Sequence, residues 1–557
     1  MLAIGSTGRP RLLALAVPVI ALLSRPAPGA APAGSPAGAG SAAGAVTERA
    51  MLDETAALAR ALGQARRSPF RIDWERRLVS AAEARAVAEA IVRGGVSPAE
   101  VELDEKLLQR LGLLDAGASY LDALTAALTM SGAPAGFYDP SARRLLVPSF
   151  IPLPEQRPVL AHEIAHALQD QRFGLRRFLK ATPDGRRGLS FDATLARQAL
   201  IEGDAAVLAM EVIDPRGTFP APLELTEMVQ RARDGLGAAF AGRGVAATGP
   251  ARAPSPSLSA ATPEASAPAL SSAAVSPSSP PRFLRELRAF PYIDGFAFVA
   301  RARETASWAT IDGMWSRPPD STAQILHPEK YERRQDPAAL ELPPLPLMGE
   351  GLRLARADTL GELLVRIWLS SPGPTSEAPL SPAIAERAAT GWRGDRVAIY
   401  LPIGLASASA PRAPPPLAIA EASGGADGGV TPPAPNAGGV ALAWLTQWDS
   451  DADAADFLDG VEPRLAALAA SEGGVGAEGT PTTDPIARPA RPAVWRSRAG
   501  DSIFAVERRG ALVALLLGAP PAALPSLGTM LDALSPRPGD RSRRPRPVKR
   551  DRDRDSR

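Results

Sequence analysis

The feature that most limits what this chain can fold into is the clustering of its prolines and glycines. The 557 residues include 58 prolines and 49 glycines, and many of these gather with alanine and serine in segments that lack hydrophobic periodicity. Such segments cannot bury enough apolar surface to offset the entropy lost on ordering, so they predict disordered connections. They cover residues 32–46, 241–282, 406–439 and 471–492. The folded part of the protein is therefore much shorter than the chain.

These segments leave two stretches that can fold. Residues 47–333, with 241–282 as an internal insertion, hold long helical patterns and a candidate β-hairpin formed by residues 136–138 and 145–147. Residues 350–535 combine two helical patterns with four strand-like runs. We therefore predict an α+β fold, in which a mainly helical domain with a short hairpin precedes a smaller α+β domain.

The N-terminus has the pattern of a secretory signal peptide. Two arginines precede an apolar stretch at residues 12–23, and a run of small residues follows at 28–31. This pattern predicts a signal peptide over residues 1–31, cleaved near Ala30 or Ala31. The apolar stretch of about 12 residues is shorter than the roughly 20 that cross a bilayer, so we expect no stable membrane span after cleavage. The expected location is the periplasm, the cell envelope or the extracellular space.

Composition excludes several classes of function. The formal net charge is only +2, and the densest group of arginines lies in residues 536–557, where arginine alternates with aspartate as in a solvated tail. We therefore expect no nucleic-acid partner. The chain has no cysteine, which excludes disulfides, thiolate metal sites and cysteine nucleophiles. Any bound metal must be held by His, Asp or Glu.

His162, Glu163 and His166 form the pattern H-E-x-x-H within a helix predicted for residues 158–173 and stopped by Gly174. Residues four apart lie on one helix face, so both imidazoles can bind one tetrahedral metal, and the spacing suits zinc. The chain has three histidines, and the chance of this arrangement is about one in a few thousand for such a composition. The alternative interpretations are surface histidines on a helix or a non-catalytic zinc site.

A catalytic zinc ion takes three protein ligands and leaves the fourth position to water. Because cysteine is absent and only His327 remains, a carboxylate is the favoured third ligand, and Glu202 is the best candidate. Glu202 lies in a helix predicted for residues 192–213, and small residues surround it, which would allow close approach of the histidine helix. The alternative is an exposed helical glutamate.

Two segments together resemble a known family. Residues 161–171 followed by Glu202-Gly203-Asp204-Ala205 resemble the gluzincin branch of the zincin metallopeptidases. More closely, they are similar to a group of exported, largely uncharacterised bacterial metallopeptidases. Phe290-Pro291-Tyr292 and residues 321–331 share this resemblance, which covers residues 133–333 well and the C-terminal region weakly.

The resemblance implies a zincin-like fold and a zinc metallopeptidase that hydrolyses peptide bonds through a zinc-activated water. Zn²⁺ would be bound by His162, His166 and Glu202, with Glu163 as the general base. The partner would be a peptide or protein substrate. The alternative function is a non-catalytic cell-envelope binding module with a structural zinc site.

One position departs from the family pattern. The best-known gluzincins have an Asp four residues after the ligand Glu, where it supports a ligand histidine, but this chain has Ala206. Asp170 or Asp204 could orient an imidazole instead, through its free ring N–H. Structural ion pairing, for example with Arg197, is the alternative for both carboxylates.

His327 and Tyr331 are candidates for a further role. Ser321 and Gln324 form a capping pattern that predicts a short helical turn just before His327. In gluzincins a downstream His or Tyr often helps to hold the tetrahedral oxyanion, so His327 or Tyr331 could do so. A histidine buried for packing or hydrogen bonding is the alternative.

Two expectations concern binding. An exposed edge of the hairpin over residues 136–147 could pair with an extended peptide backbone. The C-terminal region has no catalytic constellation but contains three tryptophans, so we expect it to bind substrate or a partner; these are Trp392, Trp444 and Trp448.

Overall fold

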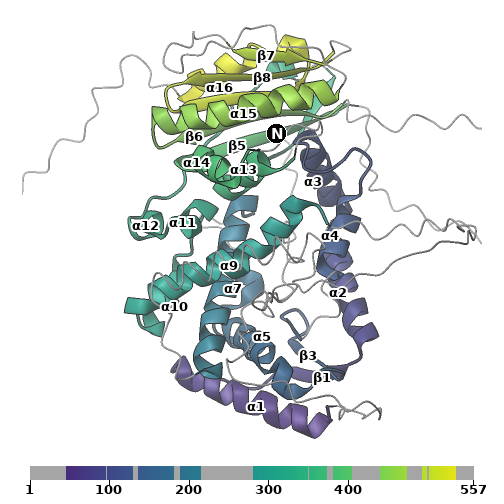
Figure 1. The fold of residues 1–557 in the computed structure, drawn as a ribbon, viewed down its shortest axis with the longest axis vertical. Helices are drawn as coiled ribbons and strands as arrows, with labels where there is room; N and C mark the ends of the chain where they lie inside the picture. The colour runs from purple at the N-terminus through teal and green to yellow at the C-terminus, as the bar shows by residue number, and fades with distance from the viewer. Residues whose placement is uncertain are drawn as a thin grey trace, which may run out of the picture.

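A computed structural model describes residues 46–95, 97–129, 136–180, 188–214, 280–348, 351–372, 380–403, 439–472, 492–497 and 501–534. The predicted signal peptide, nearly all of the four predicted disordered segments and the predicted charged tail lie outside these residues. Helices dominate the lower part of the molecule in Figure 1, and a six-stranded antiparallel sheet with its helices forms the upper part. The predicted α+β fold is confirmed.

Most of the described residues before the large sheet are helical. The first helix shows why: Thr47 caps its N-terminus by accepting a hydrogen bond from the Ala50 amide, and Met51, Leu58 and Leu62 fall on one buried face. The helices are α1 (Glu48–Ala65), α2 (Ala81–Gly95), α3 (Pro98–Arg110), α4 (Tyr120–Thr129), α5 (Leu153–Phe173), α6 (Leu175–Phe178), α7 (Phe191–Ile213), α9 (Arg282–Thr305), α10 (Trp308–Ser316), α11 (Thr322–Leu326) and α12 (Pro328–Glu332).

A small sheet lies beside these helices. Strands β2 (Phe137–Asp139) and β3 (Arg144–Pro148) form the predicted antiparallel hairpin, and β1 (Glu75–Val79) pairs with β3 in parallel. Strand β1 falls in a stretch predicted to be helical. Its pairing partner is nearly 70 residues away in sequence, and no local pattern reports such a partner.

Helix α5 carries the H-E-x-x-H pattern and begins earlier than predicted. It starts at Leu153, so Pro158 lies inside the helix and not in its first turn. Gln156 anchors the additional turn by donating to the carbonyl oxygens of Pro148 and Ile151. The predicted end is correct, because Gly174 adopts a left-handed conformation with φ of 67°. Every side chain from residue 159 to 169 is buried, so the histidine face is enclosed as well as the apolar face.

Helices α7 and α9 cross with their backbones in contact. A Cβ atom on Gly203 would lie 2.0 Å from the carbonyl oxygen of Gly295, and one on Gly295 would lie 2.2 Å from that of Ala199. The small residues around Glu202 therefore do admit a close neighbour, as predicted, but at Gly203 that neighbour is α9 and not the histidine helix.

The large sheet has the strand order β4-β5-β6-β9-β8-β7. Its predicted strands are all present. Strands β4 and β7 were not predicted, because β4 is a charged edge strand with one buried residue and β7 has only four residues. The elements are β4 (Leu352–Asp358), β5 (Trp392–Pro402), β6 (Ala441–Trp448), β7 (Ala493–Arg496), β8 (Ile503–Arg509), β9 (Leu512–Ala519), α13 (Gly361–Ser370), α14 (Pro382–Ala389), α15 (Asp451–Ser471), α16 (Ser526–Leu534) and the 3₁₀ turns η3 (Pro346–Met348) and η4 (Pro521–Ala523).

The helical part and the sheet part share one hydrophobic core. Residues of α1, α5, α7, α13, α15 and the sheet belong to a single cluster of buried side chains. Polar contacts reinforce it: the Trp368 indole N–H donates to the Leu111 carbonyl oxygen at 2.8 Å, and Arg464 donates to the same oxygen at 3.1 Å. None of the described helices is long and apolar enough to cross a membrane.

Candidate metal centre

Three donor atoms converge between α5 and α7. The Nε2 atoms of His162 and His166 lie 3.0 Å apart, and the Oε2 atom of Glu202 lies 3.0 Å from the first and 3.3 Å from the second. All three side chains are buried. Among the described residues, they are the one group of three or more His, Asp or Glu side chains that could hold a single metal ion.

The donor set fits zinc. Tetrahedral zinc with bonds of roughly 2.0–2.1 Å places its ligand atoms about 3.3 Å apart, close to the spacing of these three atoms. Two imidazole nitrogens and one carboxylate oxygen are also ligand types that zinc accepts. The two ring nitrogens face each other in a buried space, where their lone pairs repel unless a proton or a cation lies between them. The predicted ligands are therefore brought together in a geometry that a zinc ion would satisfy.

The charges of this group follow from its burial and its internal contacts. Burial and the neighbouring His166 lower the pKa of His162. Burial opposes ionisation of Glu202, but the two histidines outweigh it and lower the pKa of the carboxyl to about 2. Burial also opposes charge on His166, but Glu202 outweighs it and raises the pKa of that imidazole. Glu202 is therefore a carboxylate, the form that binds a metal.

Glu163 lies beside the three donors but faces the small sheet. Its Oε2 atom accepts a hydrogen bond of 2.8 Å from the Tyr138 amide in β2, and the side chain is buried. Burial raises the pKa of Glu163 to about 7, a value suited to proton exchange near neutral pH. Because the Tyr138 amide donates to Glu163, it is not available to an extended peptide, although the sequence predicted that an edge of this hairpin could pair with one.

Gln169 contacts His166 directly and was not singled out from the sequence. Its Oε1 atom lies 2.9 Å from the Nδ1 atom of His166, and its Nε2 atom donates to Asp204 at 2.9 Å and to the Ile201 carbonyl at 3.0 Å. Asp204 thus reaches the imidazole only through Gln169. The three-residue spacing from His166 was the available indication, since it places both side chains on one helix face.

Asp204 is an ion-pair partner as well, although not of Arg197. It accepts hydrogen bonds from both terminal nitrogens of Arg66, at 2.7 and 2.8 Å, and one of 3.0 Å from the Trp315 indole. Arg197 instead donates to the Phe178 carbonyl oxygen at 2.8 Å.

Asp170 does not touch a ligand histidine. One of its oxygens accepts from the Tyr138 hydroxyl and the other from the Leu175 amide, each at 3.0 Å, so it ties β2 to the end of α5. The Nδ1 atom of His162 is buried and has no hydrogen-bond partner among the described residues. This chain thus has Ala206 where the gluzincin pattern has a supporting Asp, and the His162 imidazole has no hydrogen-bond partner at Nδ1 among the described residues.

Tyr292 of α9 completes the surroundings of the three donors. Its ring centre lies 6.4 Å from that of His162, and the Glu202 carboxylate is close enough to act on its hydroxyl electrostatically. Burial, with the Glu202 charge, raises the pKa of Tyr292 well above its ordinary value, so the hydroxyl stays a donor. The sequence indicated this residue only as part of the resemblance, without a role.

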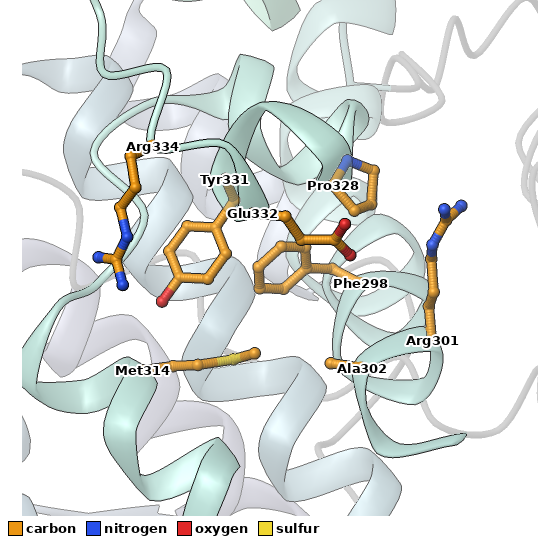
Figure 2. A pocket seen from close by; sticks show the side chains of 8 residues that line it. All are labelled: Phe298, Arg301, Ala302, Met314, Pro328, Tyr331, Glu332 and Arg334. Atoms are coloured by element: carbon orange, nitrogen blue, oxygen red, sulfur yellow. The ribbon is translucent and has the colours of Figure 1, made fainter. Parts of the chain in front are cut away.

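The structure does not bring His327 or Tyr331 to the three donors. The Nε2 atom of His327 lies 2.6 Å from the Oε1 atom of Glu362 in α13, after the short capped helix that was predicted. The Tyr331 hydroxyl donates to the Arg317 carbonyl at 2.7 Å. Figure 2 shows its ring beside Phe298 in a surface pocket of about 110 Å³. Both side chains are engaged elsewhere, and the expected oxyanion role has no geometric support.

The expected binding tryptophans are also placed elsewhere. Trp392, Trp444 and Trp448 are each at most 2% exposed and pack in the core of the C-terminal part. They stabilise the fold and offer no binding surface in this conformation.

Comparison with known proteins identifies one family match. Residues 351–526 match a family described as a domain of unknown function (DUF8575). No curated protein and no solved structure matches the chain. The matched residues form most of the sheet part and do not include the three donors.

Proposed function

We propose that this protein is a zinc-dependent peptidase. The observation that carries the proposal is the convergence of His162, His166 and Glu202, with the carboxylate of Glu163 on the same helix turn. The short strand β2, hydrogen-bonded to that carboxylate, supports a zincin-like arrangement in the helical part. The resemblance of residues 161–171 to the gluzincins supports the same assignment.

The residues divide the chemistry among them. His162, His166 and Glu202 would hold zinc, which when bound supplies a Lewis acid that polarises a peptide carbonyl and lowers the pKa of water. Glu163 would take a proton from the attacking water and deliver it to the leaving amine. The Tyr138 amide holds the Glu163 carboxylate in place for both transfers.

Glu163→Gln tests this function. It keeps the shape and the amide contact of the side chain but removes the proton acceptor, so hydrolysis should fall by about 10²–10⁴-fold. Zinc content and thermal stability should stay at the wild-type level. Hydrolysis would be measured with fluorescein-labelled casein and with a quenched-fluorescent peptide library. Glu155→Gln, in the exposed first turn of the same helix, is the matched control and should keep full activity.

Two results would overturn the proposal. Equal hydrolysis by wild type and Glu163→Gln would show that this carboxylate is not the base. Zinc bound by a wild-type protein that hydrolyses neither casein nor the library would favour the alternative, a binding module with structural zinc.

We also propose that the protein is exported, on the basis of the pattern in residues 1–31. Intact-mass measurement of the protein purified from the cell envelope and medium should show an N-terminus near residue 31. A full-length N-terminus would contradict cleavage.

A further inference from the structure

The orientation of the Gln169 amide is fixed by its partners. Its Nε2 atom lies within hydrogen-bond distance of an Asp204 carboxylate oxygen and the Ile201 carbonyl oxygen, at 2.9 and 3.0 Å. Both of these are acceptors, so only the NH₂ end of the amide can face them. The amide oxygen of Gln169 must then face His166, where it lies 2.9 Å from Nδ1.

This orientation decides which nitrogen of His166 carries the proton. An amide oxygen accepts hydrogen bonds and cannot donate one, so Nδ1 of His166 must be the N–H donor. In the neutral imidazole the lone pair is then on Nε2, the atom that lies 3.3 Å from Glu202 and 3.0 Å from the Nε2 of His162. Gln169 thereby selects the tautomer that can bind a metal at the convergence point.

The Asp204 carboxylate, which accepts a hydrogen bond from Gln169, is itself held by a residue at the end of α1. Arg66, at the C-terminal end of α1, contacts both oxygens of Asp204 and also pairs with Asp312 of α10. Its guanidinium lies 4.2 Å from the ring centre of Trp308. Arg66, Asp204 and Gln169 are each at most 3% exposed, so water does not compete for these bonds.

We propose that Gln169, held by Asp204 and Arg66, is a positioning residue for the metal ligand His166. The series Arg66–Asp204–Gln169–His166 connects α1 and α7 to α5 and gives one of the two ligand imidazoles its orientation and tautomer. The other, His162, has no such partner among the described residues. Among the described residues, only one of the two imidazoles therefore has a hydrogen-bond partner at Nδ1. This inference rests on the proposed function, because it assigns zinc to the site.

Gln169→Met tests the inference in the full-length protein. Methionine keeps the length of the side chain but cannot accept from His166, so zinc affinity should fall by about 10–100-fold. Affinity would be measured with zinc alone, by competition with a chromophoric chelator. Gln156→Met is the matched control, because Gln156 is buried in the same helix and donates to two carbonyl oxygens without touching a ligand. It should lower the melting temperature to a similar extent and leave zinc affinity at the wild-type value.

A measurement on the unaltered protein keeps the inference testable if Gln169→Met does not fold. The chain has only three histidines, so ¹⁵N-histidine labelling gives a spectrum that can be assigned. Two-bond ¹H–¹⁵N correlations of the zinc-loaded protein should show a protonated Nδ1 and an unprotonated, metal-bound Nε2 for His166. A metal-bound Nδ1, or wild-type zinc affinity in Gln169→Met, would overturn the inference.

The outcomes separate this inference from the proposed function. If wild type binds zinc, Gln169→Met weakens that binding and no peptide is hydrolysed, the positioning role stands and the peptidase fails. If wild type hydrolyses peptides and Gln169→Met binds zinc as tightly as wild type does, the peptidase function is supported and the positioning role of Gln169 is wrong. If wild type takes up no zinc, both are wrong.

Discussion

At the scale of single residues, Glu202 is the donor of the candidate metal centre that joins two helices. His162 and His166 come from one turn of α5, whereas Glu202 reaches them from α7 with a side chain two methylene groups long. Its carboxylate lies within 3.3 Å of both ring nitrogens. The length of this side chain is therefore as important as its charge.

Glu202→Asp should lose zinc while the fold persists. The shorter side chain withdraws the carboxylate by about 1.5 Å, so zinc affinity should fall by more than the roughly 10–100-fold that loss of a supporting residue costs. Glu211→Asp is the control on the same helix, because Glu211 contacts Arg303 and Trp308 and no ligand. Chelator competition measures both variants. Zinc affinity in Glu202→Asp within threefold of wild type would show that the third ligand is another group.

Local spacing and composition carried the prediction of the three donors, whereas the role of Glu163 came from the resemblance to the gluzincins. Two histidines four apart share a helix face, and the absence of cysteine pointed to a carboxylate. Gln169 and Tyr292 were missed as site residues because their roles depend on contacts with Asp204 and Glu202, and no spacing rule reports contacts between helices. The prediction for His327 came from the family pattern, and the structure pairs this residue with Glu362 instead.

At the scale of elements, the crossing of α7 and α9 depends on glycine. Because Gly203 follows Glu202 directly, its close contact with Gly295 places the helix that carries Glu202 against α9. This crossing also places Tyr292, three residues before Gly295, beside the carboxylate of Glu202. The close approach of two backbones thus determines how near Tyr292 lies to Glu202.

Gly203→Ala should destabilise the protein and disturb zinc binding together. The added Cβ would meet the Gly295 carbonyl oxygen at 2.0 Å, so the helices must separate, and overpacking of this kind costs about 1–3 kcal/mol or more. Gly313→Ala is the control, because a Cβ there meets nothing within 4 Å inside helix α10. It should leave stability unchanged or raise it by about 0.5–1 kcal/mol. Chemical denaturation gives both values, and equal stability of the two variants would contradict the close crossing.

Elements with strong local patterns were predicted well. Helix α7 was predicted to within one residue at its start, since Ser190 caps it and its core-facing residues are periodic. Strands β1 and β4 were missed because their pairing partners are distant in the sequence, and β7 was missed because it has only four residues. The predicted start of α5 is wrong because Pro158 lies inside the helix, which hydrogen bonds of Gln156 help to extend to Leu153.

At the scale of the whole molecule, the sheet part holds the N-terminal end of α7. The Asp192 amide donates to the Thr359 carbonyl oxygen at 3.3 Å, and Asp395 of β5 accepts from the Leu360 and Gly361 amides at 2.8 Å. Gly361 has φ of +84°, and a Cβ there would meet the Asp192 carboxyl at 1.8 Å. The N-terminal end of the helix that carries Glu202 is therefore held by contacts with the sheet part.

Titratable groups where α7 meets the sheet part make the stability of the protein depend on pH. Burial, followed by the nearby charges of Asp395 and Glu362, raises the pKa of Asp192 from 3.8 to about 8. Burial raises the pKa of Asp395 to about 6. The hydrogen bond to Glu362 raises the pKa of His327. A raised pKa means that the folded state binds the proton more tightly than the unfolded state, so each group stabilises at low pH and loses that contribution as pH rises.

For Asp192 this loss should extend from about pH 4 to pH 8, the interval between its unfolded and folded pKa values. Asp192→Asn imitates the protonated carboxyl and still accepts from the Thr322 amide and hydroxyl. It should therefore reduce the decline in unfolding free energy by up to about 1.4 kcal/mol per pH unit within that interval. Asp53→Asn, at an exposed position on α1, should not change the decline. Denaturation curves from pH 4 to 9 measure the slopes, and parallel curves for wild type and Asp192→Asn would show that the carboxyl is ionised in the folded protein throughout.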